Sequence, residues 1–358
     1  MDRPNVIFIL TDDQGPWAAG CYGNPEIRTP NIDRIARAGI LFSHFFVATP
    51  VCSPSRATFL TGRIPSQHGI HEWIKDENVG PKATALTASE VAYTDIMAQH
   101  GYRCGLSGKW HLGDSQHPQH SFDFWFAHQL GGGPYNNAPM VRDGRLVNEP
   151  GYVTDVITDE ALEFINANHQ RRFYLSVHYT APHSPWTGHP QDIVDSYDDC
   201  PFETCPQEPR HPWAVQLTDN CLGNREMLKG YFAAVTAMDD NLGRILDRVD
   251  ELGLREDTLI IFASDNGFSC GHHGFWGKGN GTRPRNMYEN SIRVPFIVSH
   301  PGTIPQGRTE DAMVTAYDFF PTLLEYLDLP LPEGRNLPGT SFLPALHGRP
   351  IPGNESVV

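Results

Sequence analysis

The sequence predicts an α/β fold in which one large, mostly parallel β-sheet is flanked by helices on both faces. The main observation is that strand-like apolar runs alternate with helical stretches along the chain. The first apolar run, residues 6–11, is continuous, which is typical of a strand buried on both faces. The 358 residues are 39% hydrophobic and 11% aromatic, enough for a sizeable core in one large domain or two smaller ones.

The elements follow one another from residue 6 to residue 327. A helix is expected over 31–38, directly after Pro30, and another where Cys52 precedes the helix-prone residues 57–60. Further helices are expected near 89–100, 153–168, 225–252 and 317–327, and further strands at 102–106, 173–179, 258–263 and 294–298. The Pro-rich, acidic segment 182–219 is predicted to be a surface insertion between a strand and a helix.

The charge of the chain excludes some classes of partner. A formal net charge of −15 argues against nucleic acid, because phosphate binding needs clustered Lys and Arg. The same field repels anionic substrates in general. Any sulfate or phosphate site must therefore be a local positive cluster, assisted by a metal, within an acidic surface.

The cysteines and the first residues bear on the cellular compartment. Of the seven cysteines, Cys200, Cys205 and Cys221 lie in or next to the insertion, and the sequence leaves open whether two of them form a disulfide. No CxxC pair is present, so no structural zinc site is expected. The apolar run 5–10 is too short for a signal peptide or a membrane span. The expected location is the cytoplasm, or the periplasm or cell exterior if a leader has been removed, with no membrane partner.

Polar side chains follow several of the expected strands. Asp12 and Asp13 come after the first strand, His183 after 173–179, and Asp265-Asn266 after 258–263. Ligands in open α/β sheets bind beyond the carboxyl ends of the strands, so these side chains are expected to converge. Asp12, Asp13, Asp265 and Asn266 offer only hard oxygen ligands, which suit Ca²⁺ best and also Mg²⁺. Each pair, taken singly, is also typical of an ordinary turn.

One short motif gives these residues a chemistry. Cys52-Ser53-Pro54-Ser55-Arg56 resembles the signature of type I sulfatases, which belong to the alkaline phosphatase superfamily. Further motifs occur in family order over nearly the whole chain: Thr11-Asp12-Asp13, Thr61-Gly62-Arg63, Gly108-Lys109-Trp110-His111, Ala181-Pro182-His183, Ser264-Asp265-Asn266-Gly267, Gly277-Lys278 and Val294-Pro295. The resemblance implies an alkaline-phosphatase-like sulfatase fold. It also implies that Cys52 is oxidised to formylglycine by a formylglycine-generating enzyme.

The resemblance also implies a division of roles. Asp12, Asp13, Asp265, Asn266 and the modified Cys52 would bind calcium, with Asp265 also accepting the proton of the nucleophilic hydroxyl. The catalytic residues would be Cys52, Arg56, Lys109, His111, His183 and Lys278.

Within the catalytic set, His183 would protonate the leaving alcohol, and His111 would take a proton when sulfate is expelled. Arg56, Lys109 and Lys278 would form the positive cluster around the sulfate. Lys109 and His111 are expected to share one face of an extended segment, with Trp110 pointing the other way.

Residues beside these motifs are predicted to form the substrate pocket. Aromatic and polar side chains interleaved in loops suit stacking against a sugar ring, although packing between long loops gives the same composition. The predicted set is Gln14, His71, Trp73, His273, Trp276 and Arg285.

The function predicted from the sequence is hydrolysis of a sulfate ester, with a sulfated carbohydrate as the preferred substrate class. Two alternatives remain at this stage: a phosphonate or phosphate ester hydrolase on the same fold, and a non-catalytic glycan or anion binder with unmodified Cys52. We expect the catalytic domain to span 1–350, with residues 351–358 beginning a C-terminal subdomain that is missing or truncated. The sequence gives no prediction of the oligomeric state.

Overall fold

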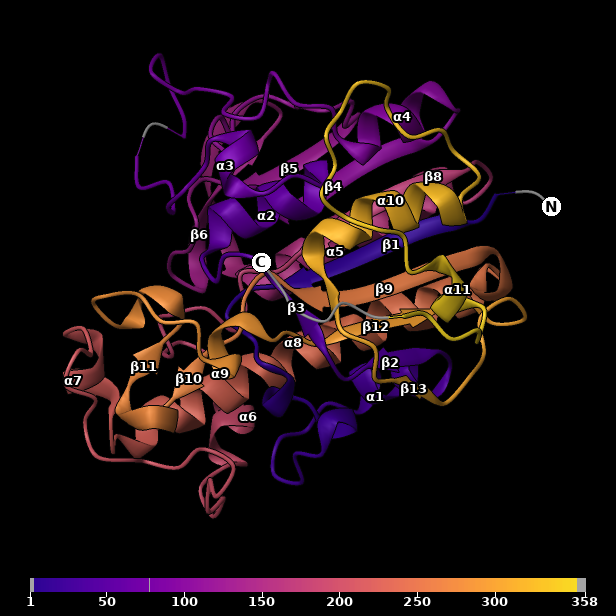
Figure 1. Cartoon of the computed structure of the whole chain (residues 1–358). Helices are drawn as coiled ribbons and strands as arrows, with labels where there is room; N and C mark the ends of the chain where they lie inside the picture. The colour runs from indigo at the N-terminus through magenta and orange to yellow at the C-terminus, as the bar shows by residue number, and fades with distance from the viewer. Residues whose placement is uncertain (1–2, 77, 353–358) are drawn as a thin grey trace.

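A ten-stranded sheet runs through the middle of the molecule (Figure 1). The structure is a computed structural model that describes residues 3–76 and 78–352. Across the sheet the strands lie in the order β13 (Arg308–Glu310), β2 (Ile40–Phe42), β12 (Phe296–Ser299), β9 (Thr258–Ser264), β1 (Asn5–Thr11), β8 (Phe173–His178), β4 (Arg103–Lys109), β5 (Phe124–His128), β6 (Asn136–Arg142) and β7 (Arg145–Tyr152).

The sequence predicted a mostly parallel sheet, and the sheet has a parallel centre with antiparallel pairs on either side of it. The central strands β9, β1, β8, β4 and β5 are parallel to one another. Towards the edges, β12 is antiparallel to β9 and β2, and β5, β6 and β7 pair antiparallel. Asp143 and Gly144 join β6 to β7 with φ of 51° and 71°, the conformation of a two-residue hairpin turn. This Asp-Gly pair was the sequence signal for a hairpin that the strand prediction missed.

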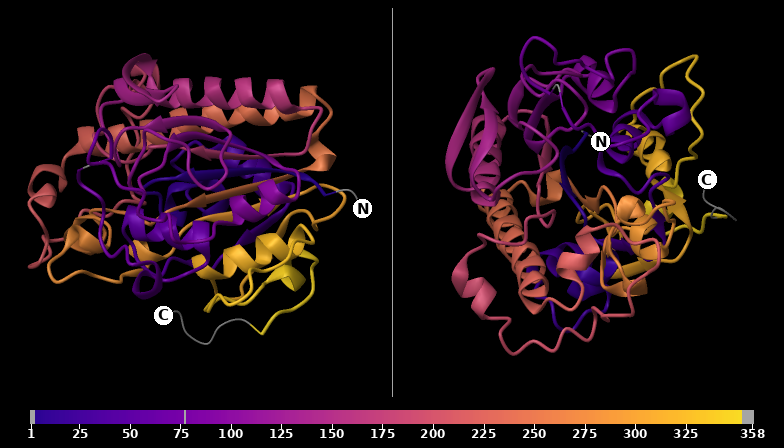
Figure 2. Two further views of the ribbon diagram at one scale, coloured as in Figure 1. Left: turned by 90° about the horizontal axis from the view of Figure 1, so that it is seen from above. Right: turned by 90° about the vertical axis from the view of Figure 1, so that its left-hand side faces the viewer.

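Helices cover both faces of the sheet, as predicted. One face carries α1 (Pro30–Arg37), α5 (Val153–Asn168) and α8 (Arg225–Glu251); the other carries α2 (Cys52–Thr61), α4 (Tyr93–Gln99) and α10 (Ala316–Tyr326). Figure 2 shows α5 and α8 side by side on one side of the sheet and α10 on the other. Along β1, Phe8 faces the α2 and α10 side, while Ile7 and Ile9 face the α5 and α8 side. Burial of both faces explains the continuous apolar run.

The remaining elements are short. They are the helices α3 (Pro65–His68), α6 (Gln191–Asp195), α7 (Leu217–Cys221), α9 (Glu289–Ile292) and α11 (Leu343–Leu346), and the strand pairs β10 (Ser269–Cys270) with β11 (Trp276–Gly277) and β3 (Phe45–Phe46) with β14 (Val314–Thr315). Single 3₁₀ turns lie at Pro16–Ala18, Gly20–Tyr22, Arg255–Asp257, His272–Gly274 and Gly279–Gly281. No helix in the described ranges is both long and apolar enough to cross a membrane.

The insertion lies between β8 and α8, as predicted, but it is more than a surface loop. Its residues Trp186, Tyr197 and Phe202 are buried in a third apolar cluster with Phe232 of α8 and Trp276 of β11. None of the seven cysteines forms a disulfide in the structure, so the three in the insertion and in α7 are free thiols. Of the C-terminal subdomain start expected at 351–358, residues 353–358 lie outside the described residues.

Candidate active site

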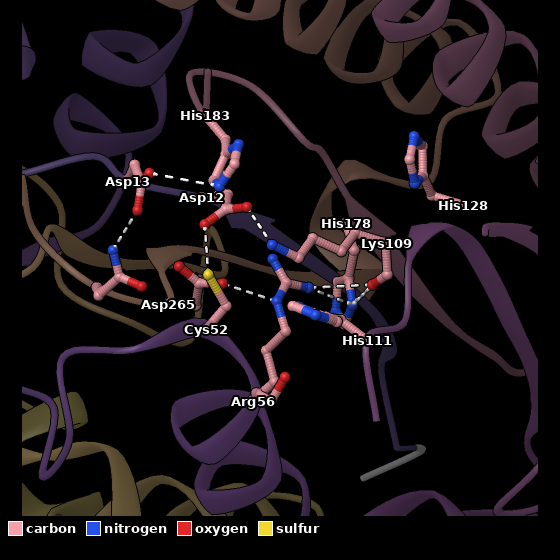
Figure 3. A network of polar contacts seen from close by, with 12 residues as sticks. Asp12, Asp13, Cys52, Arg56, Lys109, His111, His128, His178, His183 and Asp265 are labelled. Carbon is pink, nitrogen blue, oxygen red and sulfur yellow. Dashed lines mark hydrogen bonds and ion pairs between the residues drawn. The ribbon is translucent and has the colours of Figure 1, made fainter. Parts of the chain in front are cut away.

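The ends of the central parallel strands bring the predicted polar residues together. Asp12 and Asp13 directly follow β1, Lys109 ends β4, and Asp265 directly follows β9. These strands are close neighbours in the sheet, and their carboxyl ends lie at the same edge. Figure 3 shows their side chains pointing toward one another, with His183 reaching in from the loop after β8.

Cys52 stands at the centre of this group, as the first residue of α2. Its Sγ donates to Asp12 Oδ1 at 3.3 Å and lies 2.7 Å from Lys278 Nζ. Pro54 fits the first helical turn, where no backbone N–H is required. Burial, together with the Asp12 carboxylate, raises the pKa of the Cys52 thiol to about 12. The unmodified thiol is therefore protonated at neutral pH and is a poor nucleophile.

The acidic residues form a compact cluster suited to a hard cation. Ligand atoms of Asp12, Asp13, Cys52 and Asp265 all lie within 4.8 Å of one another, and all four residues are buried. Asp265 Oδ1 and Asn266 Oδ1 are buried without a hydrogen-bond partner among the described residues. Burial, followed by the facing Asp12 carboxylate, raises the pKa of Asp265 to about 7. Unpartnered oxygens and crowded carboxylates fit a divalent metal site, with the thiol marking the place of a ligand oxygen.

Each of the two predicted lysines, Lys109 and Lys278, forms an ion pair with one of these carboxylates. Lys109 Nζ forms a buried ion pair with Asp12, and Lys278 Nζ lies 2.5 Å from Asp13 Oδ1. Burial alone would raise the pKa of Asp12, but Lys109 and the neighbouring cations hold it well below its usual value. The local positive cluster required by the acidic composition is therefore present.

Arg56 is turned toward the acidic cluster. Its Nε donates to Asp265 Oδ2 at 2.7 Å, and its Nη1 donates to the Lys109 carbonyl at 3.0 Å. The spacing of one helical turn after Cys52 brings it there, as expected from the sequence. In this arrangement Arg56 orients Asp265 and binds the end of β4, while its Nη2 has no partner in the described part of the chain.

His111 is held in one tautomer. Its Nε2 donates to the Ile74 carbonyl at 2.8 Å, and its buried Nδ1 has no partner among the described residues. Burial, and then the Lys109 ammonium, keeps the pKa of His111 well below its usual value, so the ring is neutral with its lone pair on Nδ1. The predicted extended alternation is wrong here, because His111 has a left-handed φ of 59°. Trp110 does point away, packing against Trp125 at 5.2 Å.

In His183 the other ring nitrogen, Nδ1, makes the hydrogen bond to the backbone. Its Nδ1 donates to the Ser184 carbonyl at 2.8 Å, which directs Nε2 toward the cluster, 3.9 Å from Asp13 Oδ2. In Figure 3 the ring lies above Asp12 and beside Asp13, to which a dashed line joins it. A protonated Nε2 can therefore reach a group bound at the nucleophile.

A glycine loop after β5 closes over both histidines. A Cβ on Gly131 would lie 2.1 Å from His111 Cε1, and one on Gly132 would lie 2.8 Å from His183 Nδ1. Only residues without a side chain allow this approach. The run Gly131-Gly132-Gly133 was the signal in the sequence, but it lies outside the motifs and was missed.

The cluster opens into a cavity of about 350 Å³. Of the predicted pocket residues, Trp73 and Trp276 line it. The cavity also includes residues that were not predicted, namely Ile74, Lys75, Leu130, Gly131, Gly132, Ser184, Trp186, Val215, Leu217, Phe268, Gly277, Asn280 and Gly281. Most of these belong to loops whose approach depends on the tertiary fold, so no local pattern identified them.

The other four predicted pocket residues have different surroundings, which corrects that part of the prediction. Gln14 is buried and donates to the Ala18 carbonyl at 2.9 Å. His273 stacks on Tyr288 with ring centroids 4.3 Å apart. Arg285 forms an ion pair with Glu72 and contacts the backbone of His71, outside the cavity lining. These contacts are the loop packing that the sequence could not distinguish from substrate binding.

Comparisons with known proteins agree with this geometry. The family model described as Sulfatase matches residues 4–329. The chain is 28% identical to the N-acetylglucosamine-6-O-sulfatase of Bacteroides thetaiotaomicron, covering 96% of this chain and 71% of that protein. It is 32% identical to the N-acetylgalactosamine-6-sulfatase of Canis lupus familiaris, covering 96% of this chain and 66% of that protein.

A solved structure extends the comparison to three dimensions. A complex of a protein with its substrate D-glucosamine-2-N,6-O-disulfate superposes with a TM-score of 0.82 at 27% identity, covering 99% of this chain and 82% of that one. The chain spans about two thirds of the length of the two curated relatives named above. With the match over residues 4–329 and the buried Cys52 and aspartate cluster in one site, the chain belongs to the sulfatase family of sulfuric ester hydrolases.

Proposed function

We propose that this chain hydrolyses the sulfate ester of a saccharide, with a 6-O-sulfated hexosamine as the substrate class. The observation that carries the proposal is the cavity, whose lining includes Cys52, His183 and Lys278. A volume of about 350 Å³ is at the small end of ligand pockets and suits a single sugar ring. Trp73 and Trp276 in its walls offer aromatic surfaces of the kind that pack against sugars. The names of the related proteins support the 6-sulfated hexosamine.

The proposal includes a bound metal ion and a covalent modification of Cys52. Asp12, Asp13, Asp265 and Asn266 would hold Ca²⁺, because their ligand atoms are hard oxygens and those of Asp265 and Asn266 lack partners. Cys52 would be converted to formylglycine by a formylglycine-generating enzyme. When both are in place, the aldehyde hydrate supplies the attacking hydroxyl and the cation lowers its pKa.

The residues of the chain then have separate tasks. Lys278 and Lys109, each next to an aspartate, stabilise negative charge on the sulfate oxygens. His183 Nε2 gives a proton to the departing alcohol oxygen. His111 Nδ1, whose lone pair is free, accepts the proton that must leave when sulfate is released. Arg56 keeps Asp265 oriented through its 2.7 Å contact.

The test is sulfate release from 6-O-sulfated N-acetylglucosamine and N-acetylgalactosamine. The protein is produced with and without a formylglycine-generating enzyme, and Cys52→Ala serves as the control that cannot be matured. We expect release only from the co-expressed protein with intact Cys52. Equal release by the Cys52→Ala control, or a clear preference for matched phosphonate or phosphate esters, would overturn the proposal.

A further inference from the structure

The cavity has one cation that the catalytic cluster does not use. Its lining includes Lys278, which is paired with Asp13 at 2.5 Å, and Lys75, on the segment that follows Trp73. Among residues 3–76 and 78–352, no acidic side chain lies within ion-pair distance of Lys75 Nζ, including the adjacent Asp76. An available ammonium in the cavity of a chain with net charge −15 points to an anionic group on the ligand.

The backbone holds the Lys75 segment against the reaction centre. The N–H of Ile74 donates to Ser53 Oγ at 3.2 Å, next to the nucleophile position, and the Ile74 carbonyl accepts from His111 Nε2 at 2.8 Å. Trp73, Ile74 and Lys75 are consecutive, and all three line the cavity. Lys75 and the proposed catalytic base, His111, therefore line the same cavity. The two hydrogen bonds of Ile74 fix the position of the Lys75 segment relative to the reaction centre.

The side chain of Lys75 is placed over an aromatic surface. Its ammonium lies 5.1 Å from the ring centroid of Trp73, which is 40% exposed. A cation over a tryptophan face is held only weakly when exposed to water, so it can move to a ligand anion without breaking an ion pair. The lysine stem has four flexible carbons, and its head binds anions as a point charge. The pair thus combines a stacking surface for a sugar ring with a charge beside it.

We propose that Lys75 binds a second anionic group of the substrate, a sulfate or a carboxylate, beside the sulfate ester that is cleaved. This inference rests on the proposed function and narrows its substrate class to saccharides with at least two anions. A cavity of about 350 Å³ suits a single sugar ring, so the second anion is placed on that ring or on the ring next to it. The sulfate ester to be cleaved lies with Cys52 and Lys278, and the second anion lies toward the wall formed by Trp73 and Lys75.

The test compares Lys75→Gln with Lys82→Gln, an exposed lysine on the same segment that does not line the cavity. Three substrates are used: 6-O-sulfated N-acetylglucosamine, D-glucosamine-2-N,6-O-disulfate, and a disaccharide joining a uronate to a 6-O-sulfated N-acetylhexosamine. For at least one doubly charged substrate we expect Lys75→Gln to raise KM about 10-fold with kcat unchanged, an effect weakened by salt. If only the disulfate is affected, the second anion is a sulfate; if only the uronate disaccharide is affected, it is a carboxylate.

The remaining outcomes are also decisive. Equal effects of Lys75→Gln on the singly and doubly charged substrates, or no effect on any, would overturn the inference. The same comparison by titration calorimetry in a Cys52→Ser background measures binding without turnover. Absent sulfate release together with a Lys75-dependent preference in binding would defeat the proposed function while leaving the second-anion site standing.

Discussion

His111 Nε2 donates a hydrogen bond to the carbonyl of Ile74 at 2.8 Å across 37 positions of the sequence. A histidine that donates from one ring nitrogen while neutral must carry its lone pair on the other. The fixed tautomer therefore makes Nδ1 a proton acceptor. Since Ile74 lines the cavity, the same hydrogen bond joins the base to the substrate site.

Replacing His111 should slow the release of sulfate without slowing the release of the alcohol. We expect His111→Ala to lower kcat by about 10²–10⁴-fold, the usual contribution of a positioned acid or base. Loss of the alcohol does not need His111, so a rapid first release of about one alcohol per enzyme should precede slow turnover. Stopped-flow measurement with a chromogenic sulfate ester detects this burst. The control is His169→Ala, at a partly exposed histidine directly after α5, and a slow first turnover would contradict the assignment.

The glycine loop gives a steric test of the same residue. In Gly131→Ala the new Cβ would lie 2.1 Å from His111 Cε1, so the ring must move. We expect kcat to fall about 100-fold, because a shift of about 1 Å in a catalytic group has that effect. The control Gly133→Ala meets His128 at 3.2 Å and should stay within a few-fold of the parent. A double variant with His111→Ala should lose little more than His111→Ala alone.

Removing the divalent cation should destabilise the fold, because the aspartates of the cluster are buried together. Ca²⁺ at a hundred times its Kd should raise the free energy of unfolding by about 2.7 kcal/mol. Calorimetry of chelated protein, with Ca²⁺ or Mg²⁺ added back, measures the shift. We expect Asp13→Asn to reduce it strongly and Asp247→Asn, in an exposed ion pair on α8, to leave it unchanged. Identical melting of chelated and Ca²⁺-loaded wild-type protein would count against a calcium site.

The stability of the protein should also depend on a histidine outside the site. Burial lowers the pKa of His189 to about 4, against an ordinary value near 6.5 in the unfolded chain. Between these values the unfolded state binds more protons, so stability is lost as the pH falls from about 6.5 toward 4. One such group contributes a loss of about 2 kcal/mol between pH 7 and pH 5.

His189→Gln should remove the part of the stability loss between pH 7 and pH 5 that His189 causes. His189 Nδ1 lies 2.9 Å from the Tyr152 hydroxyl, and an amide can keep a hydrogen bond there. Urea unfolding at pH 7 and pH 5, for both proteins and at saturating Ca²⁺, gives the four free energies. If the wild type and His189→Gln lose equal stability on acidification, His189 is not buried in its neutral form.

Much of the fold follows from local sequence. The run 6–11 became β1, and the helices expected at 153–168 and 225–252 were found within a residue, because their periodicity and length are local properties. The strands β5, β6 and β7, which pair antiparallel with one another, were missed. Of these, β7 alternates between exposed and partly buried residues at the edge of the sheet and gives no apolar run.

The sequence by itself determined which residues gather at the site. Cys52 lies at the start of a helix, and Asp12, Asp13 and Asp265 follow parallel strands, so chain order places them at one edge of the sheet. Only the tertiary structure decided the tautomer of His111, the approach of Gly131, and the place of Lys75 in the cavity wall. The physical reason is that a ring's proton and a loop's position are fixed by partners distant in the chain, and no local pattern records those contacts.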